Sequence, residues 1–114
     1  MRSPVIALGD IYAQVPHLDE VTALMRRTQE SMRKLPGCIS YAFAETLEEP
    51  GHFLVVQQWR DEAALEAHFR STEFAAYQAG IRGLLVRSSE LRVHSAEELY
   101  RPFTSAGDDP QFDE

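Results

Sequence analysis

The chain lacks the features that several common protein classes require. It holds one cysteine among 114 residues, so no disulfide can form within it, as is typical of a protein from the reducing cytoplasm. No apolar run approaches the ~18 residues of a membrane helix, and the N-terminal apolar stretch reaches an aspartate too soon for a secretion signal. We therefore expect a cytoplasmic protein that does not enter a membrane.

Positive charge is also scarce. The formal net charge is −7, with 18 acidic and 11 basic residues, whereas a surface that binds nucleic acid carries a basic excess. Residues 104–114 contain four acidic residues and no basic one. We expect one domain over residues 1–100, because a chain of this length buries a single core, followed by a disordered acidic tail over residues 101–114. No nucleic-acid partner is expected.

The short motifs of familiar catalytic sites are missing as well. The chain has no G-x-G-x-x-G or P-loop pattern for nucleotide phosphates and no G-x-S-x-G nucleophile elbow. Its four histidines fall in separate predicted elements without the short spacing of metal ligands. We therefore expect neither a metal site nor a bound cofactor.

The pattern of apolar residues predicts a regular alternation of strands and helices. Strands are expected at residues 4–15, 38–45, 53–60 and 84–95, and helices at 17–35, 61–70 and 71–80. The order β-α-β-β-α(α)-β describes a split βαβ unit, which gives a ferredoxin-like α+β fold. Its four-stranded antiparallel sheet would carry the helices on one face.

Both faces of the predicted sheet carry apolar side chains in nearly every strand. In residues 4–15, for example, valine, alanine and isoleucine occupy one parity, and isoleucine, leucine and tyrosine occupy the other. A sheet covered by helices on one side only would leave such a face exposed to water. A second copy of the sheet is the simplest cover, so we expect a homodimer formed through the open face.

Residues 36–74 resemble the antibiotic biosynthesis monooxygenase family. The shared features are a Pro-Gly turn, an aromatic-bearing hairpin, a strand ending in Trp59, and a capped helix that ends at His68 before Ser71 and Phe74. The resemblance implies that ferredoxin-like monomers pair into a dimeric α+β barrel. It also implies one of several activities: cofactor-free oxygenation of polyketide anthrones or quinols, haem degradation, or isomerisation of sugar derivatives.

The departures from the family pattern narrow these activities. The resemblance implies a site asparagine in both the anthrone oxygenases and the haem degraders, and this chain contains no asparagine. Gln78 stands where the haem degraders carry their axial histidine, so haem degradation is not expected. Gln58 replaces a glutamate that is common before the tryptophan, which removes one candidate carboxylate.

His68 and Asp10 are the candidate bases. An imidazole titrates near neutral pH and could remove a phenolic proton, but His68 shares a helix face with Leu65 and could equally be a packed core residue. Asp10 could be a partly buried carboxylate with a raised pKa, provided that its side of the first strand faces inward. If Asp10 instead lies at the strand edge, it is only a solvated acid.

Four aromatic residues are candidate substrate contacts. Trp59 could stack on a planar ring, although a lone tryptophan on a strand is commonly a core residue. Tyr41 and Phe53 lie on adjacent hairpin strands and could form a pocket wall or a dimer seam. Tyr77, on the last helix, could donate a hydrogen bond to a ligand oxygen or simply pack there.

These observations lead to one principal hypothesis and two alternatives. The principal one is a cofactor-independent monooxygenase that oxidises an electron-rich aromatic, such as a quinol or an anthrone-like phenol, with O2. The substrate would lie between the sheet and the helices, in an apolar cavity that excludes water. The alternatives are a non-oxidative binder or isomerase of the same fold, and a dimeric protein without catalysis.

Overall fold

The computed structural model describes residues 3–97 and 99 and contains a four-stranded antiparallel sheet. The strands are β1 (Val5–Tyr12), β2 (Cys38–Glu45), β3 (His52–Trp59) and β4 (Glu90–Ser95), arranged in the order β2-β3-β1-β4. The predicted ferredoxin-like fold is confirmed. The acidic tail predicted for residues 101–114 lies outside the described residues.

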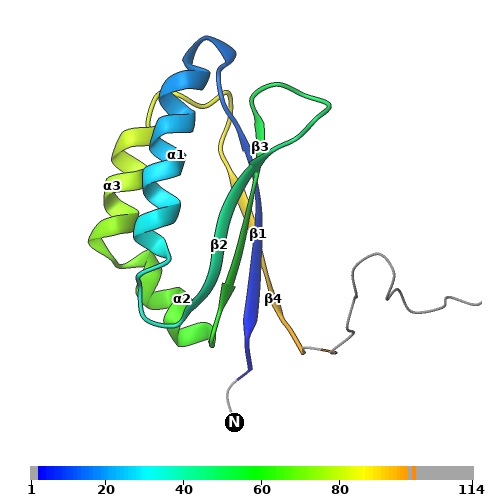
Figure 1. Cartoon of the computed structure of the whole chain (residues 1–114), viewed down its shortest axis with the longest axis vertical. Helices are drawn as coiled ribbons and strands as arrows, with labels where there is room; N and C mark the ends of the chain where they lie inside the picture. Colours follow the sequence, from blue (N-terminus) through cyan, green and yellow to red (C-terminus); the bar gives the residue numbers. More distant parts are fainter. Residues whose placement is uncertain (1–2, 98, 100–114) are drawn as a thin grey trace, which may run out of the picture.

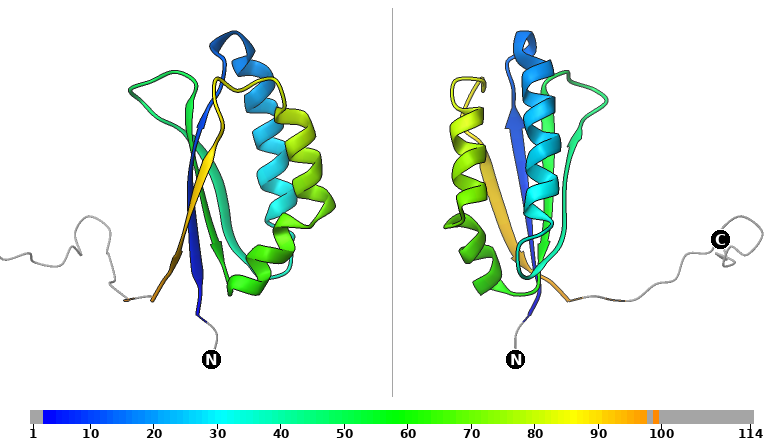
Figure 2. Two further views of the ribbon diagram at one scale, coloured as in Figure 1. Left: turned by 180° about the vertical axis from the view of Figure 1, so that it is seen from behind. Right: turned by 60° about the vertical axis from the view of Figure 1, so that its left-hand side comes forward.

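All the helices cover the same face of the sheet (Figures 1 and 2). They are a short 3-10 turn, η1 (Val15–His17), followed by α1 (Leu18–Met32), α2 (Glu62–Phe69) and α3 (Thr72–Ile81). None of the described helices covers the other face of the sheet (Figure 2). Within the described part of the chain, no helix is long and apolar enough to cross a membrane.

Two side-chain caps divide the segment after β3 into separate helices. The Asp61 carboxylate accepts a hydrogen bond from the Ala64 backbone N–H at 2.8 Å and so begins α2. The Ser71 hydroxyl accepts one from the Phe74 backbone N–H at 3.1 Å and begins α3. Such oxygens satisfy N–H groups that a helix cannot bond internally. The bend between the two helices brings the rings of Phe69 and Phe74 to 5.3 Å.

The two central strands alternate strictly between the covered and the open face. On β3, Phe53, Val55, Gln57 and Trp59 are buried under the helices, whereas Leu54 and Val56 are exposed. On β1, which pairs with β3 in antiparallel register, Leu8 is opposite Val56 and is also exposed. A period of two places these side chains on opposite faces of the sheet.

The last strand is shorter than predicted. It begins at Glu90, not at residue 84, and residues 82–89 form a connection that passes over one end of the helical layer. This connection is tied to the end of β1: the Val86 N–H donates to the Tyr12 carbonyl at 2.7 Å, and the Gln14 amide donates to the Leu85 carbonyl at 3.0 Å. Its apolar residues suggested a strand, but Leu84 and Leu85 pack against the core beyond the point where β1 ends, and Val86 is exposed.

Candidate functional site

A cavity of about 370 Å³ lies between the sheet and α3. This volume is within the range of small-molecule sites. Aromatic side chains from β2, α2 and α3 make up much of its wall: Tyr41, Phe43, Phe69, Phe74 and Tyr77. Two of these rings, Phe43 and Tyr77, are stacked with centroids 5.8 Å apart and planes 29° apart. The wall is therefore suited to a flat, apolar ring system.

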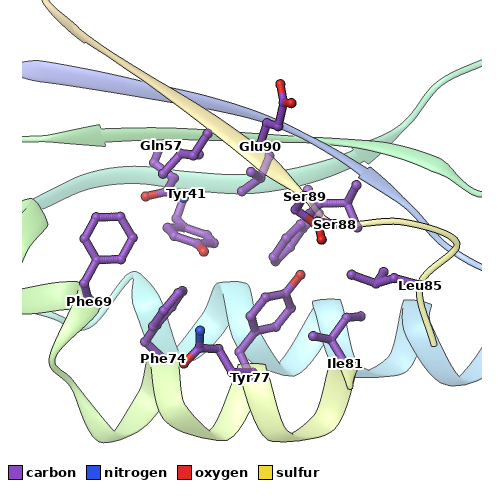
Figure 3. A pocket seen from close by; sticks show the side chains of 15 residues that line it. Tyr41, Gln57, Phe69, Phe74, Tyr77, Ile81, Leu85, Ser88, Ser89 and Glu90 are labelled. Atoms are coloured by element: carbon purple, nitrogen blue, oxygen red, sulfur yellow. The ribbon is translucent and has the colours of Figure 1, made fainter. Parts of the chain in front are cut away.

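Hydroxyl groups enter this cavity from both layers. Figure 3 shows the hydroxyl of Tyr41 pointing from the sheet toward the helices and that of Tyr77 pointing from α3 toward the sheet. Burial raises the pKa of Tyr77 to about 12 and that of Tyr41 further, with a smaller contribution from the neighbouring phenol. Both side chains are consequently neutral hydrogen-bond donors at physiological pH.

Gln57 adds an amide to the sheet wall of the cavity. Its side chain is only 3% exposed and lies directly opposite Tyr41 in the β2–β3 pairing. The Trp59 indole N–H donates to the Gln57 carbonyl oxygen at 2.9 Å. Trp59 itself is fully buried and does not line the cavity, so its contact with the site passes through Gln57.

The connection after α3 closes one end of the cavity with Leu85, Ser88 and Ser89 (Figure 3). Glu90, at the start of β4, follows them, and its carboxylate points away from the cavity. In the β1–β4 register Glu90 is opposite Asp10, which lies on the open side of the sheet. No inward-directed carboxylate, lysine or arginine is therefore among the described residues that line the cavity.

His68 lies behind the aromatic wall rather than in the cavity. It is 1% exposed, and its ring centroid is 4.8 Å from Trp59, 5.0 Å from Phe74 and 5.8 Å from Tyr41. Neither ring nitrogen has a hydrogen-bond partner among the described residues. Burial lowers the pKa of His68 to about 4, and the nearby Leu65 carbonyl, which does not complete a hydrogen bond, opposes this only in part. The imidazole is thus neutral at physiological pH.

Asp10 lies on the opposite, open face of the sheet. Its carboxylate is 2.8 Å from the Nε2 atom of His52. The Tyr12 ring stacks on His52 at 4.4 Å, and the Arg87 guanidinium lies 3.8 Å above Tyr12. These residues form a polar cluster at one end of the open face, separated from the cavity by the sheet itself.

Of the six predicted site residues, Tyr41 and Tyr77 line the cavity. Trp59 and His68 support its wall from behind, Phe53 is buried further along β3, and Asp10 is on the other face. The residues that sequence reasoning missed include Gln57, Phe69 and Phe74. Gln57 lies two positions before Trp59, and alternate residues of a strand share a face. This spacing was the one signal in the sequence that could have identified Gln57.

Potential metal ligands do not converge in the described part of the chain. No group of three or more histidine, cysteine, aspartate or glutamate side chains lies close enough together there to hold an ion. Cys38, half-buried at the start of β2, has a pKa that burial raises and Arg33 lowers to a smaller extent.

Comparison with known proteins places this architecture among solved structures. A protein of Mycobacterium tuberculosis, Rv0793, is 23% identical, matches 87% of this chain and 100% of its own, and superimposes with a TM-score of 0.79. PA3566 of Pseudomonas aeruginosa is 24% identical over 86% of this chain and 98% of its own, with a TM-score of 0.77. At these identities the likeness establishes the fold alone.

Sequence comparison gives a relative and a family. The uncharacterized protein sll1783 of Synechocystis is 33% identical over 95 residues, which are 83% of this chain and 65% of that protein. The chain thus spans less than two thirds of the length of the relative it matches. The profile of the family described as antibiotic biosynthesis monooxygenase matches residues 4–80. The match covers β1 through most of α3, and this chain belongs to the antibiotic biosynthesis monooxygenase family.

Proposed function

We propose that this protein is a monooxygenase that acts on an electron-rich aromatic, such as a quinol or an anthrone-like phenol, without a bound cofactor. The observation that carries the proposal is the cavity itself. Its wall is largely apolar and holds five aromatic rings, and its lining includes two neutral phenols and the amide side chains of Gln57 and Gln78. Membership of the family supports the oxygenase class.

The chemistry needs only a substrate anion and O2. Loss of a proton from an anthrone-like CH2 or its phenol form gives an electron-rich anion, which can pass an electron to O2. Conversion of the CH2 to a carbonyl puts one oxygen atom in the product and the other in water, and the four electrons that reduce O2 come from the substrate carbon. The protein would orient the ring, exclude water and stabilise the anion.

Stabilisation of the anion is the step to which the cavity is best suited. The hydroxyls of Tyr41 and Tyr77 and the Gln57 amide can each donate to a substrate oxygen that gains negative charge. Such donors lower the pKa of the bound substrate, because they interact more strongly with its charged form. His68 and Asp10 were the candidate bases, but neither side chain lines the cavity, so we propose that the substrate gives its proton to water before the ring is enclosed.

A second candidate function is ligand binding without turnover. This function is favoured because no inward-directed acid or base is found among the described cavity residues. A carrier or sensor would need the aromatic wall and the donors but no proton acceptor. An isomerase would need a base at the reacting carbon, and the described cavity offers none.

We also propose that two copies of the chain pair through their open sheet faces. Leu8, Leu54 and Val56 are exposed on the two central strands, where Leu8 is paired with Val56 and Leu54 lies two residues before Val56 on the same face. An exposed apolar patch at the centre of a sheet marks an interaction surface. A second copy would bury it symmetrically, and the family resemblance implies the same arrangement.

Oxygen uptake on chelator-treated protein tests the catalytic proposal. A panel of hydroquinones and anthrones would be supplied, and uptake would be compared with autoxidation in buffer. The control pair is Leu85→Trp, which places an indole in the end wall of the cavity, and Val86→Trp, at the neighbouring solvent-exposed position. We expect the first variant alone to abolish uptake, with both folded by circular dichroism.

Uptake that the two variants support equally would place the chemistry outside this cavity. Saturable binding of the panel without oxygen consumption would instead identify the carrier or sensor function.

A further inference from the structure

We propose that Gln57, held in one orientation by Trp59, is the specificity determinant of the cavity and selects ligands that present a ring ketone or phenolate oxygen. The inference rests on the proposed function in one respect, namely that the ligand occupies this cavity. It goes beyond that function in two ways. It names the chemical group that the cavity recognises, and it gives Trp59, a residue outside the cavity, a positioning role.

The orientation of the Gln57 amide follows from the chemistry of its partner. An indole N–H can donate a hydrogen bond but cannot accept one. At 2.9 Å from the Trp59 nitrogen, the atom of Gln57 must therefore be the carbonyl oxygen. A flipped amide would set N–H against N–H and would leave a buried donor unpaired, at a cost of about 1–3 kcal/mol. Trp59 thus fixes which end of the amide remains available.

The available end is the amide NH2, and no group of the described residues accepts a hydrogen bond from it. Gln57 points to the helix side of the sheet, between Val55 and Trp59, and is among the residues that line the cavity. Its side-chain nitrogen has no hydrogen-bond partner among the described residues, and this nitrogen is not fully enclosed by protein atoms. The NH2 group therefore reaches the cavity as an unused donor.

Tyr41 reinforces the same preference. It is opposite Gln57 on β2, and directly paired side chains in an antiparallel sheet have Cβ atoms about 4.5–5.5 Å apart. Its hydroxyl points into the cavity (Figure 3). An oxygen with two lone pairs can accept from both residues at once, whereas a hydrocarbon ring would leave both donors without a partner.

The charge of the cavity wall limits the ligand further. No lysine or arginine is among the described residues that line it, so a carboxylate would lose its water without gaining a cation. A ketone is uncharged and a phenolate disperses its charge over the ring, so each has a smaller desolvation cost than a carboxylate. The ligand class is therefore a planar aromatic with a ring oxygen and no carboxylate group near Gln57.

Paired ligand titrations test this inference without relying on turnover. The probes are 1-tetralone, which presents a ring ketone, and tetralin, its counterpart without oxygen. Affinities would be measured by ligand-observed NMR for the wild-type protein, Gln57→Leu, Trp59→Phe and Gln58→Leu. Gln58 is the matched control, because it is the next residue on β3 and faces the open side of the sheet.

We expect the wild-type protein to prefer 1-tetralone by about fivefold to tenfold, the value of one or two hydrogen bonds. Gln57→Leu should bring the preference close to one while tetralin binds within about twofold of the wild type. Trp59→Phe should reduce the preference as well, since the amide is then free to turn. Gln58→Leu should leave the preference unchanged.

A wild-type protein that does not prefer 1-tetralone, or a preference that survives in Gln57→Leu, overturns the inference. So does an equal loss in Gln58→Leu. These outcomes are distinct from failure of the proposed function. If the protein consumes O2 but does not prefer 1-tetralone, the oxygenase proposal stands and the role assigned to Gln57 does not. If it prefers 1-tetralone but consumes no O2, only the binding role of Gln57 stands.

Discussion

Replacement of His68 by leucine should make the stability of the protein less dependent on pH. The folded chain holds His68 with a pKa of about 4, whereas an unperturbed histidine has a pKa of 6.5. Between these values the unfolded chain binds a proton that the folded chain does not, so stability falls as the pH drops from about 6.5 to about 4. Above pH 6.5 the His68 imidazole is neutral in both the folded and the unfolded chain, so its contribution to stability is fully retained.

The size of the effect follows from the shift. Its full value corresponds to roughly 3 kcal/mol. A second, small cavity between α2 and the turn after α1 is lined by His68. It brings solvent near the ring and reduces the penalty for charging it. We therefore expect the wild-type protein to lose about 2 kcal/mol more than His68→Leu between pH 7 and pH 4.5.

Urea denaturation at the two pH values, followed by circular dichroism, measures this difference. Carboxylates also titrate in the range, but their contribution is common to both proteins and cancels in the comparison. His94→Leu is the control, because His94 is exposed on β4. If wild type and His68→Leu lose the same stability, the imidazole is not held neutral by burial and the reasoning is refuted.

Three further predictions concern single elements. Asp61→Ala should lower the free energy of unfolding by about 1 kcal/mol in urea denaturation, because its carboxylate caps α2 at 2.8 Å; a loss no larger than that of Asp61→Asn, which keeps an acceptor, would contradict this. Gly37→Ala should cost about 3 kcal/mol in thermal unfolding, since φ is +81° and a Cβ would lie 2.5 Å from that of Ala64. Gly83→Ala has the same φ with open space around it and should cost only about 1 kcal/mol; equal costs would show that the clash is unimportant. Val56→Arg should convert a dimer into a monomer by light scattering, and an unchanged mass would place the interface elsewhere.

The order of the elements and the fold could be predicted because most of the boundaries had a local chemical cause. Asp61 and Ser71 begin their helices through side-chain caps, and the Pro36-Gly37 turn separates α1 from β2, although α1 ends at Met32, three residues before the predicted end. Alternation along residues 53–59 gave the face of every β3 side chain. These signals lie within a few residues of the feature that they determine.

The site was harder to predict because it depends on contacts between distant segments. Both parities of β1 are partly apolar, so the sequence could not show that the helices cover the side opposite Asp10. The helical spacing of His68 allowed a base or a packed residue, and its apolar surroundings come from β2, β3 and α3. Leu85 was predicted to lie in a strand. Its role in closing the cavity depends on where β1 ends, which the residues around Leu85 do not show.

The connection from α3 to β4 also determines how a ligand can exchange. The helices themselves cannot easily separate, since Gly80 lets α3 approach Leu24 of α1 so closely that an added Cβ would lie 2.9 Å from its side chain. Backbone anchoring of the connection to β1 ends at Val86, and sheet pairing resumes at Glu90. The Arg87 side chain still contacts the Tyr12 ring, so Ser88 and Ser89 are the residues that can move without breaking the layers on either side. Entry and exit should then follow the local opening of these two residues, on the timescale of loop motion rather than of unfolding.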